Sequence, residues 1–250
     1  SRRINEIEID ETLFRKKDNA AIFDKAVPYV DLDSGEIKGF VDLKEIYDAK
    51  CTDCANLSNL KGQLERLGIK INNYERIDSS SETGKELIRE NDILYLNALL
   101  ITKEINEYWW VFDDIKTTLI ENENYYKFSE PISPYKEIST GRIKGKIKLT
   151  YITNKSCDEC FNVTILKPVF QNLGIYIDSE KYIDVSSAEG KDTLKAYNIT
   201  AIPTAILSKE ILDYDKIKKI LEQVGSFEKD ETFVLRKLDA LKVKYQNIGG

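Results

Sequence analysis

Residues 146–160 read KIKLTYITNKSCDEC, and this stretch decides how the second half of the chain is interpreted. Its first eight residues alternate apolar and polar positions and are rich in β-branched side chains, which predicts a β-strand. Two cysteines, Cys157 and Cys160, follow three positions apart, and the next apolar stretch ends at Gly174. Glycine is common just beyond a helix C-terminus. The pattern therefore predicts a strand that runs into a Cys-x-x-Cys pair opening a helix over 157–173.

The first half of the chain repeats this pattern. Cys51 and Cys54 lie 106 positions before Cys157 and Cys160. Sliding the sequence on itself by that distance aligns 81 positions without a gap, and 28 of them are identical. Self-similarity at a fixed period is the signature of a duplicated structural unit. We therefore predict two domains of the same fold in tandem.

The remaining pattern of the second repeat alternates strands and helices. The expected elements are an extended segment over 175–185, a short helix over 192–197, a strand over 199–207 that Pro203 interrupts, and a helix over 215–224. From the repeat, the expected organisation is an N-terminal extension over 1–27, a first domain over 28–130 and a second domain over 131–250.

The composition excludes several classes of protein. The chain has 250 residues, 42% hydrophobic and 32% charged, so it can bury one large or two ordinary cores. Its net charge of −6 and the lack of a basic stripe argue against nucleic-acid binding. No apolar run is long enough to cross a bilayer. The absence of histidine excludes Ser–His and Cys–His catalysis and histidine metal ligands.

All four cysteines belong to the two Cys-x-x-Cys pairs, a spacing that indicates either redox pairs or metal ligation. A metal held by all four would require the two cysteine-bearing faces to be pressed together, because each pair lies inside a complete repeat. We therefore favour redox pairs and expect neither a metal nor a cofactor.

Residues 146–208 resemble the thioredoxin superfamily. The resemblance rests on the strand before Cys157, the Cys-x-x-Cys pair, the helix after it, and the segment YNITAIPT over 197–204, which is similar to a Tyr-x-Ile-x-x-Ile/Val-Pro-Thr stretch of that family. The tandem layout resembles archaeal protein disulfide oxidoreductases and the paired domains of protein disulfide isomerases.

This resemblance implies an α/β fold in which a central mixed sheet is flanked by helices. It implies a cis bond before Pro203, with the proline lying against the disulfide; the alternative is an ordinary edge-strand proline. It also implies thiol-disulfide exchange with protein thiols and disulfides and with a redox partner that the sequence does not name. In the first repeat Asn97 stands where the second has Pro203, and we predict a trans bond between Leu96 and Asn97 because a cis bond before a non-proline residue is rare.

The expected chemistry follows from the position of each cysteine pair. A cysteine at the first turn of a helix lies near unpaired N–H groups and the positive end of the helix dipole, which stabilise a thiolate. Cys157 and Cys51 are therefore the candidate nucleophiles, and Cys160 and Cys54 the resolving cysteines that close the disulfide. The alternative is a disulfide that only staples the chain at this point.

The residues between the cysteines suggest the direction of electron flow. Asp158 and Glu159, and Asp53 in the first repeat, place carboxylates near the sulfur atoms. One such charge at about 5 Å disfavours a thiolate by roughly 1 kcal/mol at a partly solvated site, and about 1.4 kcal/mol corresponds to roughly 30 mV for a two-electron couple. We therefore expect a reducing couple, with Lys50 and Lys155 offsetting part of the effect.

Glu45 is a further candidate. It lies six residues before Cys51, where related enzymes keep a buried acid that moves the proton of the resolving cysteine, whereas the second repeat has Tyr151 there. Such a role requires a raised pKa through burial. The alternative is an ordinary exposed glutamate on a strand.

Two functions remain in competition at this stage. The first is a thiol-disulfide oxidoreductase whose second domain is the better equipped. The second is a protein-binding module whose cysteine pairs are structural disulfides. The chain contains no methionine, and all its cysteines are paired in motifs. These two features favour an exported or membrane-anchored location over a cytoplasmic one by a narrow margin.

Overall fold

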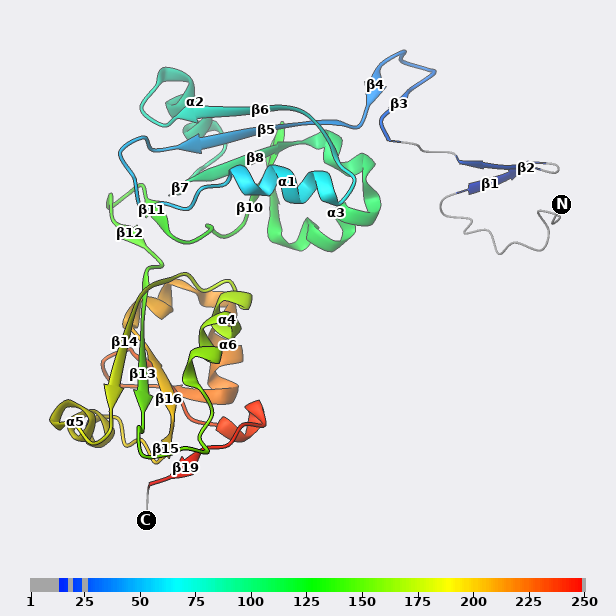
Figure 1. Cartoon of the computed structure of the whole chain (residues 1–250). Helices are drawn as coiled ribbons and strands as arrows, with labels where there is room; N and C mark the ends of the chain where they lie inside the picture. The colour runs from blue at the N-terminus through cyan, green and yellow to red at the C-terminus, as the bar shows by residue number, and fades with distance from the viewer. Residues whose placement is uncertain (1–13, 18–19, 24–26, 249–250) are drawn as a thin grey trace. The chain divides into compact units, whose positions relative to one another are not determined.

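The computed structural model describes residues 14–17, 20–23 and 27–248. The chain divides into two compact units (Figure 1), one built from residues up to Thr52 and Asn56–Pro131, and the other from Asp53–Ala55 and the residues from Ile132 onward. Most of the segment 1–27, expected as an extension, lies outside the described residues. The part that is described forms a hairpin of β1 (Phe14–Lys17) and β2 (Ala20–Phe23).

The first unit contains a mixed five-stranded sheet in the order β6-β5-β8-β10-β9. Its strands are β5 (Phe40–Tyr47), β6 (Lys70–Asp78), β8 (Ala98–Thr102), β9 (Leu119–Glu121) and β10 (Tyr125–Phe128). Strands β5 and β6 are parallel, and the other neighbours are antiparallel. The helices are α1 (Ser58–Arg66), α2 (Glu82–Glu90) and α3 (Trp109–Ile115), with 3-10 turns at Lys103–Glu107 and Lys116–Thr118. Short strands β3 (Tyr29–Val30), β4 (Ile37–Lys38) and β7 (Tyr95–Leu96) complete the unit.

The second unit has the corresponding sheet order, β14-β13-β16-β18-β17. Its strands are β13 (Ile147–Thr153), β14 (Ile177–Asp184), β16 (Thr204–Leu207), β17 (Gly225–Phe227) and β18 (Phe233–Leu235). The helices are α4 (Leu166–Asn172), α5 (Ala188–Ala196) and α6 (Asp215–Val224), with 3-10 turns at Val163–Ile165, Lys209–Asp213 and Leu238–Leu241. Outside this sheet, β11 (Tyr135–Glu137) pairs with β12 (Ile143–Lys144), and β15 (Ala201–Ile202) pairs with β19 (Gln246–Asn247).

The sheet of the second unit is covered on both faces (Figure 1). One core cluster joins Leu149 of β13 to Phe170 of α4 and Leu221 of α6. A separate cluster packs Leu194 of α5 against Ile152. Because successive strand residues point to opposite faces, Leu149 and Ile152 place α4 and α6 on one side and α5 on the other.

The two units share local hydrogen bonds as well as strand order. The Tyr108 hydroxyl donates to the carbonyl of Gly39 at 2.6 Å, and the Tyr214 hydroxyl donates to that of Gly145 at the same distance. Both glycines have a positive φ, +90° and +76°. Two mixed five-stranded sheets flanked by helices are consistent with two thioredoxin-like domains.

The expected helix over 157–173 is wrong at its start. Residues 157–160 form a turn, and helical structure begins only with the 3-10 turn Val163–Ile165 that leads into α4. The Oδ1 atom of Asn162 accepts a hydrogen bond from the backbone N–H of Thr164 at 3.1 Å and so caps this start. In the first unit Asn56 accepts from the N–H of Ser58, where α1 begins. The sequence signal for this start was the asparagine two residues before a serine or threonine.

Candidate functional site

Cys157 and Cys160 form a disulfide in the turn between β13 and the 3-10 turn that precedes α4, with their Cα atoms 5.4 Å apart. Both residues are half-buried. The backbone N–H of Cys157 donates to the carbonyl of Asn154 at 3.2 Å, which closes the turn at the end of the strand. Since this turn precedes the helix, the helix dipole acts on Cys157 less than the sequence suggested, because that effect is confined to the first turn.

Pro203 lies between β15 and β16, next to this disulfide. The Ile202–Pro203 peptide bond is cis. The sulfur of Cys160 lies 3.9 Å from the carbonyl oxygen of Ile202. After the proline, the chain continues into β16, which lies between β13 and β18 in the sheet. The structure thus brings together three of the residues singled out in the sequence: Cys157, Cys160 and Pro203.

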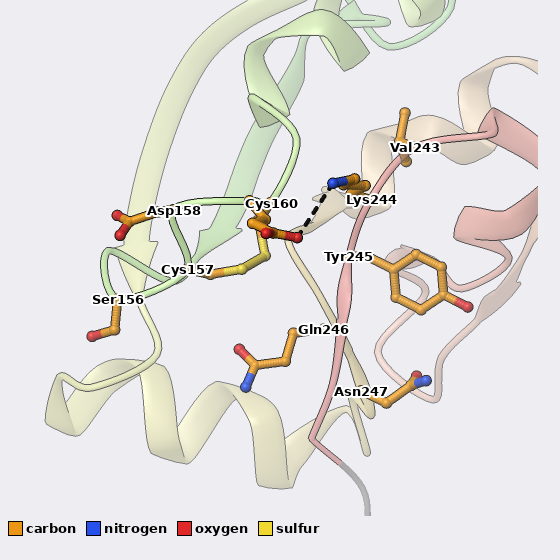
Figure 2. Close-up of a pocket in the computed structure, with 10 residues that line it drawn as sticks. Ser156, Cys157, Asp158, Cys160, Val243, Lys244, Tyr245, Gln246 and Asn247 are labelled. Atoms are coloured by element: carbon orange, nitrogen blue, oxygen red, sulfur yellow. Dashed lines mark hydrogen bonds and ion pairs between the residues drawn. A yellow bond between two sulfur atoms is a disulfide. The ribbon is translucent and has the colours of Figure 1, made fainter.

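A pocket opens beside the disulfide (Figure 2). One wall is the turn from Ser156 to Cys160, and the other is the segment from Val243 to Asn247. The Nζ atom of Lys244 lies 3.3 Å from the Oε2 atom of Glu159, so a cation from the second wall faces a carboxylate of the motif. Sequence reasoning missed this second wall, because no local pattern relates residues 243–247 to the cysteines.

The loop that carries the disulfide is tied to the end of β14. The backbone N–H of Lys155 donates to Oδ2 of Asp184 at 3.1 Å. The side chain and the backbone N–H of Ser186 donate to the same carboxylate, and these bonds lower the pKa of Asp184. The charged form is the better acceptor, so an ionised Asp184 holds the loop that carries the motif.

The first motif has a related arrangement. Cys51 and Cys54 are both disulfide-bonded and, like the second pair, precede the first helix of their repeat. The predicted trans bond at Leu96–Asn97 is wrong, since this bond is cis. The segment joins β7 to β8 as the Pro203 segment joins β15 to β16. The two corresponding segments therefore share the same bond geometry although one has Asn97 and the other Pro203.

Glu45 is fully buried on β5, so the alternative of an exposed strand glutamate is wrong. Its carboxylate accepts a hydrogen bond from the hydroxyl of Tyr74, and Nε of Arg76 lies 2.9 Å from Oε2. Burial, and then the hydrogen bond to Glu45, raises the pKa of Tyr74. The guanidinium of Arg76 compensates the buried charge of Glu45. This pairing favours a structural role for Glu45 over the proton transfer that the resemblance implies.

The second unit contains the same pair with its members exchanged. Tyr151, at the position of Glu45, donates its hydroxyl to Glu180 at 2.9 Å, and Glu180 occupies the position of Tyr74. Burial, followed by the bond to Glu180, raises the pKa of Tyr151, so its phenol stays protonated at neutral pH. The sequence signal was available in the aligned repeats, where Glu and Tyr change places.

Among the residues that the structure describes, no cluster of three or more Cys, Asp or Glu side chains is suited to hold a metal ion. Both cysteine pairs are oxidised, so their sulfur atoms are committed to disulfides rather than to a metal. Within the same residues, no helix combines the length and apolar character needed to span a membrane.

No protein-family model and no curated protein matches the chain. Among solved structures, it is similar to the NTD_N/C domain of alkylhydroperoxide reductase AhpF from Enterococcus faecalis, at 15% identity and a TM-score of 0.19, over 67% of this chain and 81% of that chain. It is also similar to a protein disulfide oxidoreductase from Aeropyrum pernix, at 12% identity and a TM-score of 0.19, over 68% of this chain and 77% of that chain. Because these TM-scores are low, the function proposed below rests on the residues of the chain itself.

Proposed function

We propose that this chain is a thiol-disulfide oxidoreductase of two tandem thioredoxin-like domains, and that Cys157 and Cys160 form its principal redox centre. The observation that carries the proposal is the half-buried Cys157–Cys160 disulfide at the end of a central strand, with the carbonyl of Ile202 3.9 Å from Cys160. An inert structural disulfide has no need of such a placement beside an open pocket.

The exchange proceeds in two steps. A thiolate of a protein dithiol attacks the sulfur of Cys157, the bond to Cys160 breaks, and Cys160 leaves as a thiolate that takes up a proton. The substrate is now joined to Cys157 in a mixed disulfide. The second thiolate of the substrate then attacks the substrate sulfur of the mixed disulfide. The substrate now holds a disulfide of its own, and Cys157 leaves as a thiolate that takes up a proton. Two electrons pass from the substrate to the Cys157–Cys160 pair, and the reverse sequence returns them.

We further propose that this couple works on the reducing side. Asp158 and Glu159 place negative charge beside any thiolate formed here, and the helix begins after the motif, so its dipole offsets little of that charge. Both effects disfavour the thiolate and hence favour the disulfide over the dithiol. The ion pair of Lys244 with Glu159 reduces the effect of one carboxylate, but both side chains are largely exposed and the pair is weak.

The test is a titration of free thiols with an alkylating probe across a glutathione and dithiothreitol redox series. The wild-type chain is compared with C51S/C54S and C157S/C160S. We expect a reversible two-electron couple at Cys157–Cys160, more negative than glutathione. A potential near that of glutathione or above it would contradict the reducing role. If both pairs stay oxidised until the protein unfolds, the disulfides are structural and the chain is a protein-binding module.

A further inference from the structure

The segment Val243–Ile248, called here the covering segment, occupies the backbone edge beside the redox centre. Its strand β19 pairs antiparallel with β15, Ala201 opposite Asn247 and Ile202 opposite Gln246. The N–H of Ile248 also donates to the carbonyl of Thr200 at 2.8 Å. Among the described strands, β15 pairs only with β19.

The covering segment also contacts the turn that carries the disulfide. The carbonyl of Lys244 accepts a hydrogen bond from the N–H of Phe161, the residue after Cys160, at 2.9 Å. The side-chain amide of Asn154 donates to Oε1 of Gln246 at 2.8 Å. The segment therefore bonds both to β15 and to the cysteine turn, and Figure 2 shows it running beside the disulfide.

An extended polypeptide that reaches Cys157 needs this same edge. A protein substrate presents its cysteine within a length of backbone, and an exposed strand edge with unpaired N–H and C=O groups is where such a backbone adds. A small thiol has no backbone to place and can enter through the pocket beside the half-buried Cys157.

The covering segment makes few buried contacts. The side chains of Lys244, Gln246 and Asn247 are exposed, and only Val243 and Tyr245 are partly buried. Short strands with few buried apolar contacts belong to the part of a protein that opens most easily. The segment can therefore leave β15 while the five-stranded sheet stays folded.

We propose that the covering segment is an internal occupant of the substrate edge, and that it must leave β15 before a protein thiol can exchange with Cys157–Cys160. This inference rests on the proposed oxidoreductase function and adds its regulation. The disulfide is open to small thiols at all times, but open to polypeptides only in the fraction of molecules whose covering segment has left. The apparent rate with a polypeptide is the rate of the open molecules multiplied by that fraction.

The experiment compares two reductants on full-length chains that carry C51S/C54S, so that the measured disulfide is Cys157–Cys160. One reductant is dithiothreitol, and the other is an unstructured 20-residue peptide with one central cysteine. Formation of thiols or of the mixed disulfide at Cys157 is followed by alkylation and mass spectrometry. The variants are a deletion of residues 243–250, I248P, which removes the donor to Thr200, and N247P as the matched control.

N247P is the control because neighbouring residues of a strand direct their N–H groups to opposite edges. Since the N–H of Ile248 faces β15, that of Asn247 faces away, and a proline there removes no bond to Thr200. We expect the deletion to raise the rate with the peptide roughly five-fold or more, as expected when the closed state predominates, and to leave the rate with dithiothreitol within about two-fold. We expect the rate of I248P with the peptide to lie between those of the wild type and the deletion variant, and the rate of N247P to equal that of the wild type. If circular dichroism shows that the deletion variant does not fold, the test is the comparison of the peptide rates of I248P and N247P.

A synthetic peptide of residues 242–248, KVKYQNI, completes the experiment when added to the deletion variant or, if that does not fold, to I248P. We expect it to slow the reaction with the cysteine peptide and not the reaction with dithiothreitol. Equal peptide rates in the wild type, the deletion variant and I248P, with both reductants active, overturn the covering role and leave the proposed function standing. If neither reductant opens the disulfide in any variant, the proposed function itself fails.

Discussion

At the scale of single residues, the two repeats make the same polar contact with exchanged partners. Glu45 accepts from Tyr74 in the first unit, and Tyr151 donates to Glu180 in the second. The hydrogen bond is present in both units because one position supplies a donor and the other an acceptor, whichever residue stands at which position. What differs is the burial of the carboxylate: Glu45 is fully buried and ion-paired with Arg76, whereas Glu180 is partly exposed and ion-paired with Lys167.

Replacing Glu45 with glutamine tests whether this residue is structural or moves protons. E45Q keeps an acceptor for Tyr74 but removes the charge that Arg76 faces, so we expect the free energy of unfolding to fall by about 1–2 kcal/mol, a modest loss because the Arg76 side chain is half-exposed. The exchange rate at Cys51 stays within about two-fold. Urea unfolding followed by tryptophan fluorescence reports stability, since both tryptophans lie in the first unit. Y151F is the control for the second unit. A ten-fold slower exchange with no loss of stability would restore the proton-transfer role.

Asp184 gives a prediction about pH. Hydrogen bonds from Ser186 hold its pKa below the usual value of 3.8 in the folded chain, so the ionised carboxylate stabilises the fold above that value. This contribution is lost as the pH falls through the lower folded pKa. We expect D184N to be less stable than the wild type at pH 7 and the difference to vanish in the acid range below pH 3.8. Urea midpoints measured across pH 2–7 check this, with D192N controlling for the loss of one negative charge. A difference that stays constant with pH would show that the charge of Asp184 is not involved.

At the scale of elements, three helical glycines fall into two groups according to the space around them. A Cβ at Gly190, near the start of α5, would lie 2.1 Å from the backbone carbonyl oxygen of Asp184. The equivalent Gly84 on α2 would meet the carbonyl of Asp78 at the same distance. The helix therefore approaches the preceding strand closely enough that only glycine fits, which explains why this residue is identical in both repeats. Gly62 on α1 has only the Nη1 atom of Arg66 nearby, at 3.8 Å.

Alanine substitutions at these glycines should have opposite signs. We expect G190A to lower the free energy of unfolding by about 1–3 kcal/mol, because backbone must move to admit the methyl group. G62A should raise it by about 0.5–1 kcal/mol, because alanine is the better helix former and meets no obstacle. Urea unfolding monitored by circular dichroism measures both. A G190A chain as stable as the wild type would mean that α5 can shift away from β14 without cost.

At the scale of the whole molecule, each unit has its own sheet and its own core, and each repeat carries one cysteine pair. The core cluster of Ile46, Ile77 and Leu100 belongs to the first unit, and that of Leu149 and Phe170 to the second. This arrangement favours two couples that titrate independently.

The double mutants of the redox titration test this independence. We expect C51S/C54S and C157S/C160S each to titrate as a single two-electron couple, and the wild-type curve to be their sum. A ten-fold change in equilibrium constant corresponds to about 30 mV for such a couple. A midpoint that moves by about 15 mV or more when the other pair is removed would show that the pairs are coupled. Alkylation followed by mass spectrometry of separated peptides assigns each midpoint to its pair.

Features that depend on local pattern can be predicted from the order of the residues alone. Alternation over 146–153 gave the strand β13, the 3.6-residue period over 215–224 matched α6, and Pro203 interrupted the extended segment between β15 and β16. The asparagine that caps the start after the second motif, Asn162, is also a local signal, and it marks a later start of helical structure than the cysteine spacing predicts. These features are decided by side-chain direction and by hydrogen bonds between near neighbours, which a linear pattern records.

Features that join residues far apart in the chain are visible only in the folded structure. The partners of Glu45 lie about thirty positions away and become neighbours through the parallel pairing of β5 with β6. The Leu96–Asn97 bond is cis where local preference predicts trans, on a path shared with the Pro203 segment. The covering segment reaches the disulfide only because β19 adds to β15. Such contacts follow from how the backbone folds back on itself, and no spacing of residues in the sequence encodes them alone.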